Sequence, residues 1–132
     1  MTAHTSLELS RYRLNTAAEC LSSAEMLINN DDCKFAANRA YYAVYHSMRA
    51  VLALDEFDSS RHSGIIAEFR KRYVKTGIFP VAMSDTISKL FDVRNKSDYE
   101  DFYVASPETV SELIEEARDF VNHVQMYLNS SR

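Results

Sequence analysis

The densest cluster of polar side chains begins at Arg94 and runs for eight residues, RNKSDYED. Arg94 and Asp98 are four residues apart, so they share a face wherever this segment is helical. A guanidinium held beside carboxylate and amide groups suits phosphate recognition, because its planar fork matches two phosphate oxygens. Asn95 is adjacent, and Tyr99 offers a ring for base stacking or a polar acceptor. The alternative is structural, because buried charges are usually paired: Asp98 or Asn38 would then hold an inward arginine that closes the bundle end.

A second set of polar and aromatic side chains falls in one narrow sector when residues 36–54 are placed on a helix at 100° per residue. The members of this sector, with His46 at its edge, are Asn38, Tyr42, Tyr45 and Arg49. One hypothesis makes them the wall of a polar groove that faces Arg94, within one chain or across a dimer. The other makes them a tyrosine-rich helix interface whose hydroxyl and amide groups satisfy one another.

His62 is the third candidate, at the expected start of a helix. It would serve as a proton-transfer group or as a local capping and packing residue. The remaining histidines, which show no ligand spacing with carboxylates or cysteines, are His4, His46 and His123. The chain also lacks a glycine-rich phosphate loop and a nucleophilic serine elbow, so we expect neither a metal site nor a cofactor.

The composition is that of one globular domain with a proper core: 132 residues, 46% hydrophobic and 26% charged. The net charge of −4 gives the whole chain no general attraction for nucleic acid, so DNA is not expected as a ligand. A local basic patch remains compatible with that charge. No apolar run approaches the roughly 20 residues of a membrane span. The N-terminus also lacks the pattern of a signal peptide, so a cytoplasmic protein without membrane contact is expected.

The elements that must position these residues are helices, since only two Gly and two Pro interrupt the chain. Hydrophobic spacing and capping residues predict helices over about 6–29, 32–55, 62–75, 81–94 and 107–128, with a polar, irregular stretch from Asn95 to Ala105. The helix through 36–54 has both an apolar stripe and a stripe of small residues, so it should be central. We therefore expect an all-α fold, an up-and-down antiparallel bundle of four to five helices, in a single domain over 1–132 with its core at about 6–128.

Four segments in this order resemble one family, the HEPN superfamily. The segments are residues 38–46 (NRAYYAVYH), 62–64 (HSG), 73–77 (YVKTG) and 94–99 (RNKSDY). Within that superfamily the match is to the small stand-alone UPF0332 branch, and it covers about residues 10–128. The resemblance implies a helical bundle that is commonly a dimer. It also implies association with a minimal nucleotidyltransferase encoded beside the gene, with the HEPN member as the toxin, often RNA-cutting, and the transferase as the antitoxin.

The RNase-active branch of that family carries an arginine, an adjacent polar residue, and a histidine four to six residues beyond the arginine. Arg94 and Asn95 match the first two positions, but Tyr99 stands where the histidine is expected and the next histidine is His123. An RNase of this type would place the histidine near the scissile phosphate and use the arginine to stabilise its charge. Tyrosine has an ordinary pKa of about 10, which makes it a poor base at neutral pH.

Three hypotheses follow. In the first, the protein is a HEPN-type binding module that holds a nucleotide or RNA phosphate at Arg94, dimerises, and partners a nucleotidyltransferase-family protein; the residues expected at this binding site are Arg94, Asn38, Tyr42, Tyr45, Arg49 and His62. In the second, it is a metal-independent endoribonuclease toxin. Its catalytic set would be Arg94, Asn95 and Asp98, with Tyr99 or His62 as the acid–base group. In the third, it is a structural helical module. The sequence leaves open whether the chain is an enzyme.

Overall fold

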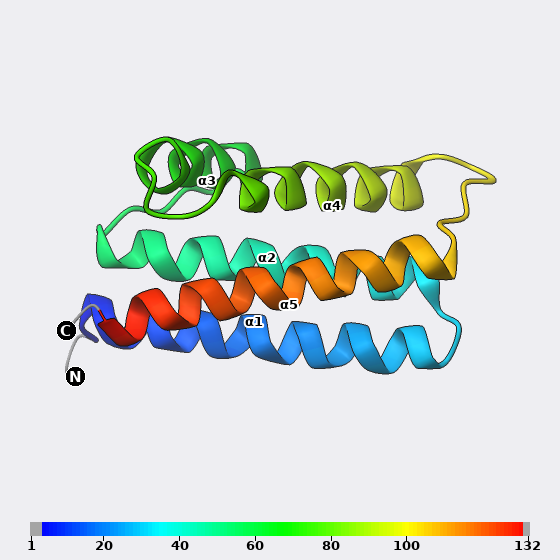
Figure 1. Ribbon diagram of the computed structural model, residues 1–132, viewed down its shortest axis with the longest axis horizontal. Helices are drawn as coiled ribbons and strands as arrows, with labels where there is room; N and C mark the ends of the chain where they lie inside the picture. The colour runs from blue at the N-terminus through cyan, green and yellow to red at the C-terminus, as the bar shows by residue number, and fades with distance from the viewer. Residues whose placement is uncertain (1–3, 131–132) are drawn as a thin grey trace.

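The computed structural model describes residues 4–130, and helices account for most of them (Figure 1). The helices are α1 (Ser6–Asn29), α2 (Cys33–Leu54), α3 (His62–Phe69), α4 (Val81–Tyr99) and α5 (Pro107–Ser130), with a π-helical segment, η1 (Arg70–Val74), continuing α3. No strand occurs within residues 4–130. The all-α bundle expected from the sequence is therefore confirmed. Positions 1–3 and 131–132 of the expected domain lie outside the described residues.

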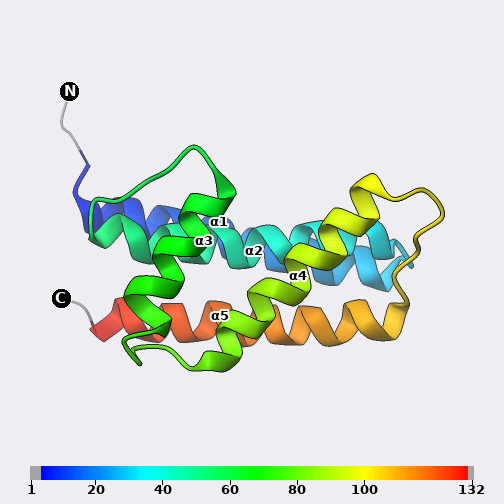
Figure 2. The same cartoon turned by 90° about the horizontal axis from the view of Figure 1, so that it is seen from above.

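The long helices α1, α2 and α5 pack together as a bundle, and α3 and α4 lie across one side of it, over α2 (Figures 1 and 2). Seen from above, α4 runs obliquely across the bundle (Figure 2). Helix α2 packs against each of the other four α-helices, as its two packing stripes predict. Its small-residue stripe allows α1 to approach closely, so that the buried Ser10 Oγ donates a hydrogen bond to the Ala50 carbonyl at 2.5 Å. No helix within residues 4–130 is long and apolar enough to cross a membrane.

Side-chain caps fix where the long helices begin. At α1, Thr5 Oγ1 accepts a hydrogen bond from the Glu8 amide at 3.1 Å, and the Glu8 carboxylate accepts one from the Thr5 amide, which completes a capping box. Asp32 accepts from the amide of Phe35 at the start of α2. Ser106 precedes α5 and accepts from the amide of Thr109. Each cap satisfies an amide that has no partner within its helix.

One boundary expected from the sequence is wrong. The segment after Arg94 was expected to be irregular, but α4 continues to Tyr99. Two pairs spaced by four residues stabilise this last stretch: Arg94 with Asp98, and Asp92 with Lys96. The polar cluster around Arg94 therefore lies on a helix, and the helix fixes the direction of its side chains.

Candidate functional site

Arg94 projects from α4 toward the tyrosines of α2. Its Nη2 atom donates to Tyr42 Oη at 3.3 Å. The guanidinium carbon lies 5.2 Å from the ring centre of Tyr41 and 5.6 Å from that of Tyr42, within the range of cation–π attraction. Only 18% of the arginine side chain is exposed. The sequence-based expectation that Arg94 points into the bundle and faces the α2 sector thus agrees with the geometry.

Asp98 pairs with Arg94 through an ion pair that is not a hydrogen bond. The Arg94 Nε atom lies 3.2 Å from Asp98 Oδ2, but its N–H is buried and finds no hydrogen-bond acceptor in the described part of the chain. A guanidinium has five N–H donors in a fixed fork. Within residues 4–130, its one hydrogen bond goes to Tyr42, so Arg94 keeps donor capacity for an anion.

His62 belongs to the same cluster. Its Nδ1 atom lies 2.8 Å from Tyr41 Oη, and the two atoms share a hydrogen bond. The imidazole stacks on Tyr45 with ring centres 4.1 Å apart. Burial is the main cause that lowers the pKa of His62, and the positive charges of Arg94 and Arg49 lower it further. The imidazole is therefore neutral at neutral pH, with one nitrogen that donates and one that accepts.

The neighbouring tyrosines stay protonated. Burial raises the pKa of Tyr41 well above its ordinary value, although the charge of Arg94 opposes that rise. Burial also raises the pKa of Tyr45. The cluster around Arg94 thus offers one guanidinium, one carboxylate, neutral hydroxyls and a neutral imidazole. Groups of these kinds can hydrogen-bond an anion through the guanidinium and hydroxyls, and can pack on a base through their rings.

The residues proposed from the sequence divide into two groups in the structure. Those that gather around the Arg94 guanidinium or the His62 ring are Asp98, Tyr42 and Tyr45. Asn38 is not among the described side chains that contact Arg94; its Oδ1 accepts from Arg39 Nη2 at 2.9 Å. Asn95 is half-buried, on α4 next to Arg94. Tyr99 is 77% exposed and is not among the described side chains that contact the arginine.

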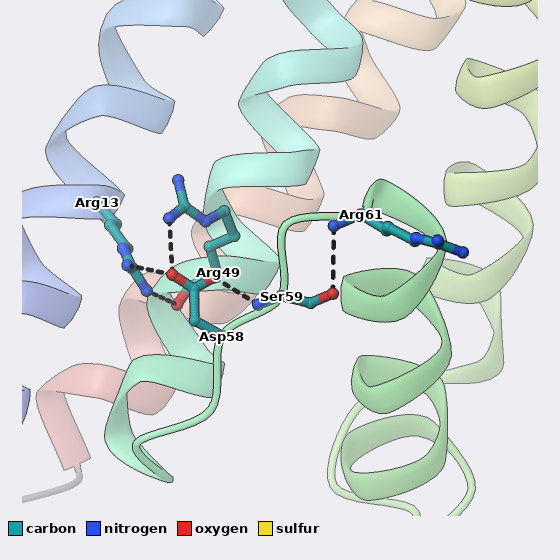
Figure 3. A network of polar contacts seen from close by, with 5 residues as sticks. All are labelled: Arg13, Arg49, Asp58, Ser59 and Arg61. Atoms are coloured by element: carbon teal, nitrogen blue, oxygen red, sulfur yellow. Dashed lines mark hydrogen bonds and ion pairs between the residues drawn. The ribbon is translucent and has the colours of Figure 1, made fainter.

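Arg49 belongs to a different polar network, which Figure 3 shows around Asp58. The Arg49 Nη2 atom lies 3.2 Å from Asp58 Oδ2, and Arg13 Nη2 from α1 lies 3.1 Å from the same oxygen. The backbone amide of Ser59 donates to the other carboxylate oxygen of Asp58 at 2.8 Å. Tyr45 lies between the two groups, since the Arg49 guanidinium carbon is 6.0 Å from its ring centre. This network ties the loop after α2 to both α1 and α2.

Sequence reasoning missed three of these contributors. Tyr41 falls on the apolar stripe of α2, where the helical spacing predicts packing alone, yet its hydroxyl bonds His62. The rule that a buried tyrosine hydroxyl finds a partner would have signalled this contact. Arg13 and Asp58 carried no local signal, because they are 45 residues apart and meet only in the folded chain. Within residues 4–130, no group of three His, Cys, Asp or Glu side chains could hold a metal ion.

Comparison with known proteins gives consistent matches over most of the chain. The model of the HEPN domain family matches residues 10–127. A UPF0332 protein of Thermotoga maritima is 31% identical over 114 residues, which cover 86% of each chain. Two Methanocaldococcus jannaschii proteins, each bearing the name "Putative toxin", are 32% identical over 115 residues and 27% identical over 117 residues. The first match covers 87% of this chain and 85% of that relative, and the second covers 89% and 80%.

Proposed function

The chain belongs to the HEPN domain family, and from this premise we propose that it is a toxin-like module that binds a nucleotide or RNA phosphate at Arg94. In this proposal the module dimerises and pairs with a minimal nucleotidyltransferase, which acts as its antitoxin. The observation that carries the binding proposal is the half-buried Arg94 guanidinium, whose hydrogen bond to Tyr42, within residues 4–130, leaves most of its donors for an anion.

The surroundings of Arg94 support a phosphate as that anion. The ring faces of Tyr41 and Tyr42 hold the guanidinium in place, so less side-chain entropy is lost when a ligand binds. Asp98 neutralises the arginine in the absence of ligand, but its Oδ2 is not aligned with the Nε–H. A phosphate that aligns with two N–H donors would make stronger, charge-assisted hydrogen bonds than this ion pair does.

Exposed apolar side chains support association with a second chain. Four of them lie between positions 91 and 104, on the second half of α4 and on the segment that follows it: Phe91, Tyr99, Phe102 and Val104. Phe102 is fully exposed and has a positive φ of 66°, which a bulky residue rarely adopts. Apolar side chains gathered on one part of a surface are typical of protein contacts. We expect the homodimer or the nucleotidyltransferase to cover them.

Binding to a 5′-phosphorylated single-stranded RNA, measured by fluorescence anisotropy, tests the role of Arg94. We expect Arg94→Gln to weaken binding by about 10- to 100-fold, the range for loss of a charge-assisted hydrogen bond. Arg118→Gln is the matched control, because Arg118 pairs with Glu25 and Glu115 on α1 and α5, away from the site. Equal affinity of Arg94→Gln and wild type would rule out this site and leave Arg94 a structural role.

Co-expression with the nucleotidyltransferase encoded beside the gene tests the pairing. We expect the two proteins to co-purify, and the protein alone to elute from size exclusion with the mass of a dimer. Separate elution of the two proteins at micromolar concentrations would count against the pairing. A monomeric mass at the same concentration would count against dimerisation.

The position of His62 favours a second candidate function, a metal-independent endoribonuclease. A neutral imidazole beside Arg94 suits a general base that takes the proton of an attacking hydroxyl, while the arginine stabilises charge on the phosphate. With Nδ1–H donating to Tyr41 Oη, the Nε2 lone pair is free for that proton. Exposed Tyr99 fits this role less well. RNA cleavage by wild type, lost in both His62→Gln and Arg94→Gln, is the expected result; cleavage that survives both substitutions would exclude the mechanism.

A further inference from the structure

A stripe of basic and aromatic side chains follows the half-buried face of α2. Arg39, Tyr42, His46 and Arg49 are spaced by three, four and three residues, which places them on one side of the helix. Arg13 joins them from α1, where its Nη1 atom donates to the Arg49 carbonyl at 3.4 Å. From Arg39 to Arg49 the stripe covers ten residues, or about 15 Å along the helix axis.

Positive charge on this stripe exceeds the negative charge that faces it. Asp58 is the carboxylate bound by both Arg13 and Arg49. The hydrogen bonds of the Arg39 guanidinium within residues 4–130 go to the neutral side chain of Asn38. The Nε atom of Arg49 is buried and has no hydrogen-bond acceptor in the same part of the chain. Arg13 and Arg49 therefore share one carboxylate, and Arg39 adds a third positive charge that no described ion pair neutralises.

The lowered pKa of His46 agrees with this excess of positive charge. Burial is the main cause that lowers its pKa to about 4, and the next causes are the charges of Arg49, Arg39 and Arg13. The imidazole is thus neutral and adds an aromatic surface between the arginines, with its ring centre 5.9 Å from that of Tyr42. Guanidinium groups interleaved with rings are typical of proteins that bind single-stranded nucleic acid, because the cations contact phosphates and the rings stack on bases.

We propose that Arg13, Arg39 and Arg49 form a second anion site, which binds backbone phosphates of single-stranded RNA, and that the Asp58 carboxylate occupies part of this site in the free protein. The proposal rests on the proposed function for the class of ligand. Asp58 lies in the loop between α2 and α3, and its side chain is 50% exposed, so an incoming phosphate can replace it at the two arginines. A carboxylate and a phosphate accept the same guanidinium fork.

Tyr42 joins this site to Arg94. The guanidinium carbon of Arg39 lies 5.3 Å from the Tyr42 ring centre, and that of Arg94 lies 5.6 Å from the same ring centre. A mononucleotide can occupy the Arg94 site alone. A strand that also contacts Arg39 and Arg49 must extend for about 15 Å along α2, so it must be longer than a mononucleotide. The ligand inferred from this arrangement is a short single strand of RNA.

Affinity for a ten-nucleotide single-stranded RNA, measured by anisotropy between 50 and 300 mM salt, tests the proposal. Asp58→Asn removes the competing charge but keeps an oxygen that can accept from Ser59, and it should tighten binding by about two- to fivefold. Arg49→Gln and Arg39→Gln should each weaken binding and reduce the slope of log K against log salt by about 0.7 for each lost phosphate contact. Arg39→Gln loses the bonds to its neighbour Asn38 and the contact with the Tyr42 ring, all of them within α2, so its fold is retained.

Two matched controls separate this effect from changes in fold or total charge. Asp55→Asn alters another carboxylate at this end of α2, one that binds Arg72 and Tyr73, and it should leave affinity unchanged. Arg118→Gln removes one positive charge elsewhere and should also leave affinity unchanged. If Asp58→Asn binds no more tightly than wild type and Arg39→Gln binds equally well, the second site does not exist.

The outcomes distinguish this inference from the proposed function. RNA binding that is lost in Arg94→Gln but unchanged in the Asp58, Arg39 and Arg49 variants overturns the second site alone. RNA binding that is unchanged in Arg94→Gln but responds to the other variants supports the second site and overturns the role of Arg94. Absence of RNA binding by the wild type at 50 mM salt overturns both.

Discussion

Replacement of His46 should make the free energy of unfolding less sensitive to acid. His46 is half-buried on α2, with the rings of Tyr42 and Tyr45 centred 5.9 and 5.5 Å from its own. Its pKa is about 4, lowered from an ordinary value of about 6.5. Burial is the largest cause, and four nearby basic groups contribute to the same shift: Arg49, Arg39, Arg13 and His62. His46 is therefore protonated only at a lower pH in the folded protein than in the unfolded chain.

The direction of the pH effect follows from proton binding. Between about pH 6.5 and pH 4 the unfolded chain binds a proton at His46 and the folded protein does not, so the free energy of unfolding falls as the pH falls. A pKa difference of about 2.5 corresponds to at most about 3.4 kcal/mol. Because the imidazole is partly exposed, solvent screens part of this cost, and we expect about 1–2 kcal/mol.

Urea denaturation of wild type and His46→Gln at pH 7.5 and pH 4.5 measures this contribution. Other groups that titrate in this range are common to both proteins, so their effects cancel in the comparison. The variant should lose about 1–2 kcal/mol less than wild type on acidification. His123→Gln on α5 controls for removal of a histidine as such. Equal losses for wild type and His46→Gln would refute the reasoning that burial and the three arginines destabilise the charged imidazole.

Three further substitutions test the fold, each by urea denaturation at pH 7.5. Gly77→Ala should cost about 1 kcal/mol, because Gly77 has a φ of 81° and an added Cβ meets nothing within 4 Å, so the cost is that of the backbone alone; no loss would contradict this. Phe69→Ala should cost about 3–5 kcal/mol, since the ring is fully buried among other aromatic rings. Tyr73→Phe removes a 2.7 Å hydrogen bond to Asp55 and should cost about 1 kcal/mol, because Asp55 keeps its ion pair with Arg72.

The fold was predictable because its signals are local. The Thr5–Glu8 capping box and the hydrophobic spacing place α1 at Ser6–Asn29, where the structure has it. The end of α4 was missed for the opposite reason: the polar residues from Asn95 onward suggest irregular structure, and ion pairs spaced by four residues override that suggestion. The π-helical turn at Arg70–Val74 also has no signature in the hydrophobic spacing, which is helical throughout.

The candidate site was predictable only in part. The helical wheel directs Arg94 inward, and the sector on α2 supplies Tyr42, so their contact follows from two local patterns and the packing of adjacent helices. The same reasoning grouped Arg49 with Arg94, but the stacked rings of Tyr45 and His62 lie between them. Arg49 instead pairs with Asp58, and a pairing between a helix and a distant loop depends on the tertiary fold.

The acidic composition and an RNA ligand are compatible because the charges are segregated. The chain carries 19 acidic and 15 basic residues, so its overall field does not attract nucleic acid. Acidic residues gather on α5, which begins with Pro107-Glu108 and carries four more acids before Phe120. The α2 stripe faces only Asp58, and Arg94 faces only Asp98, among the carboxylates whose contacts are described. The RNA binding that we propose would therefore depend on a few short-range phosphate contacts, so each arginine removed should have a large effect on both affinity and salt dependence.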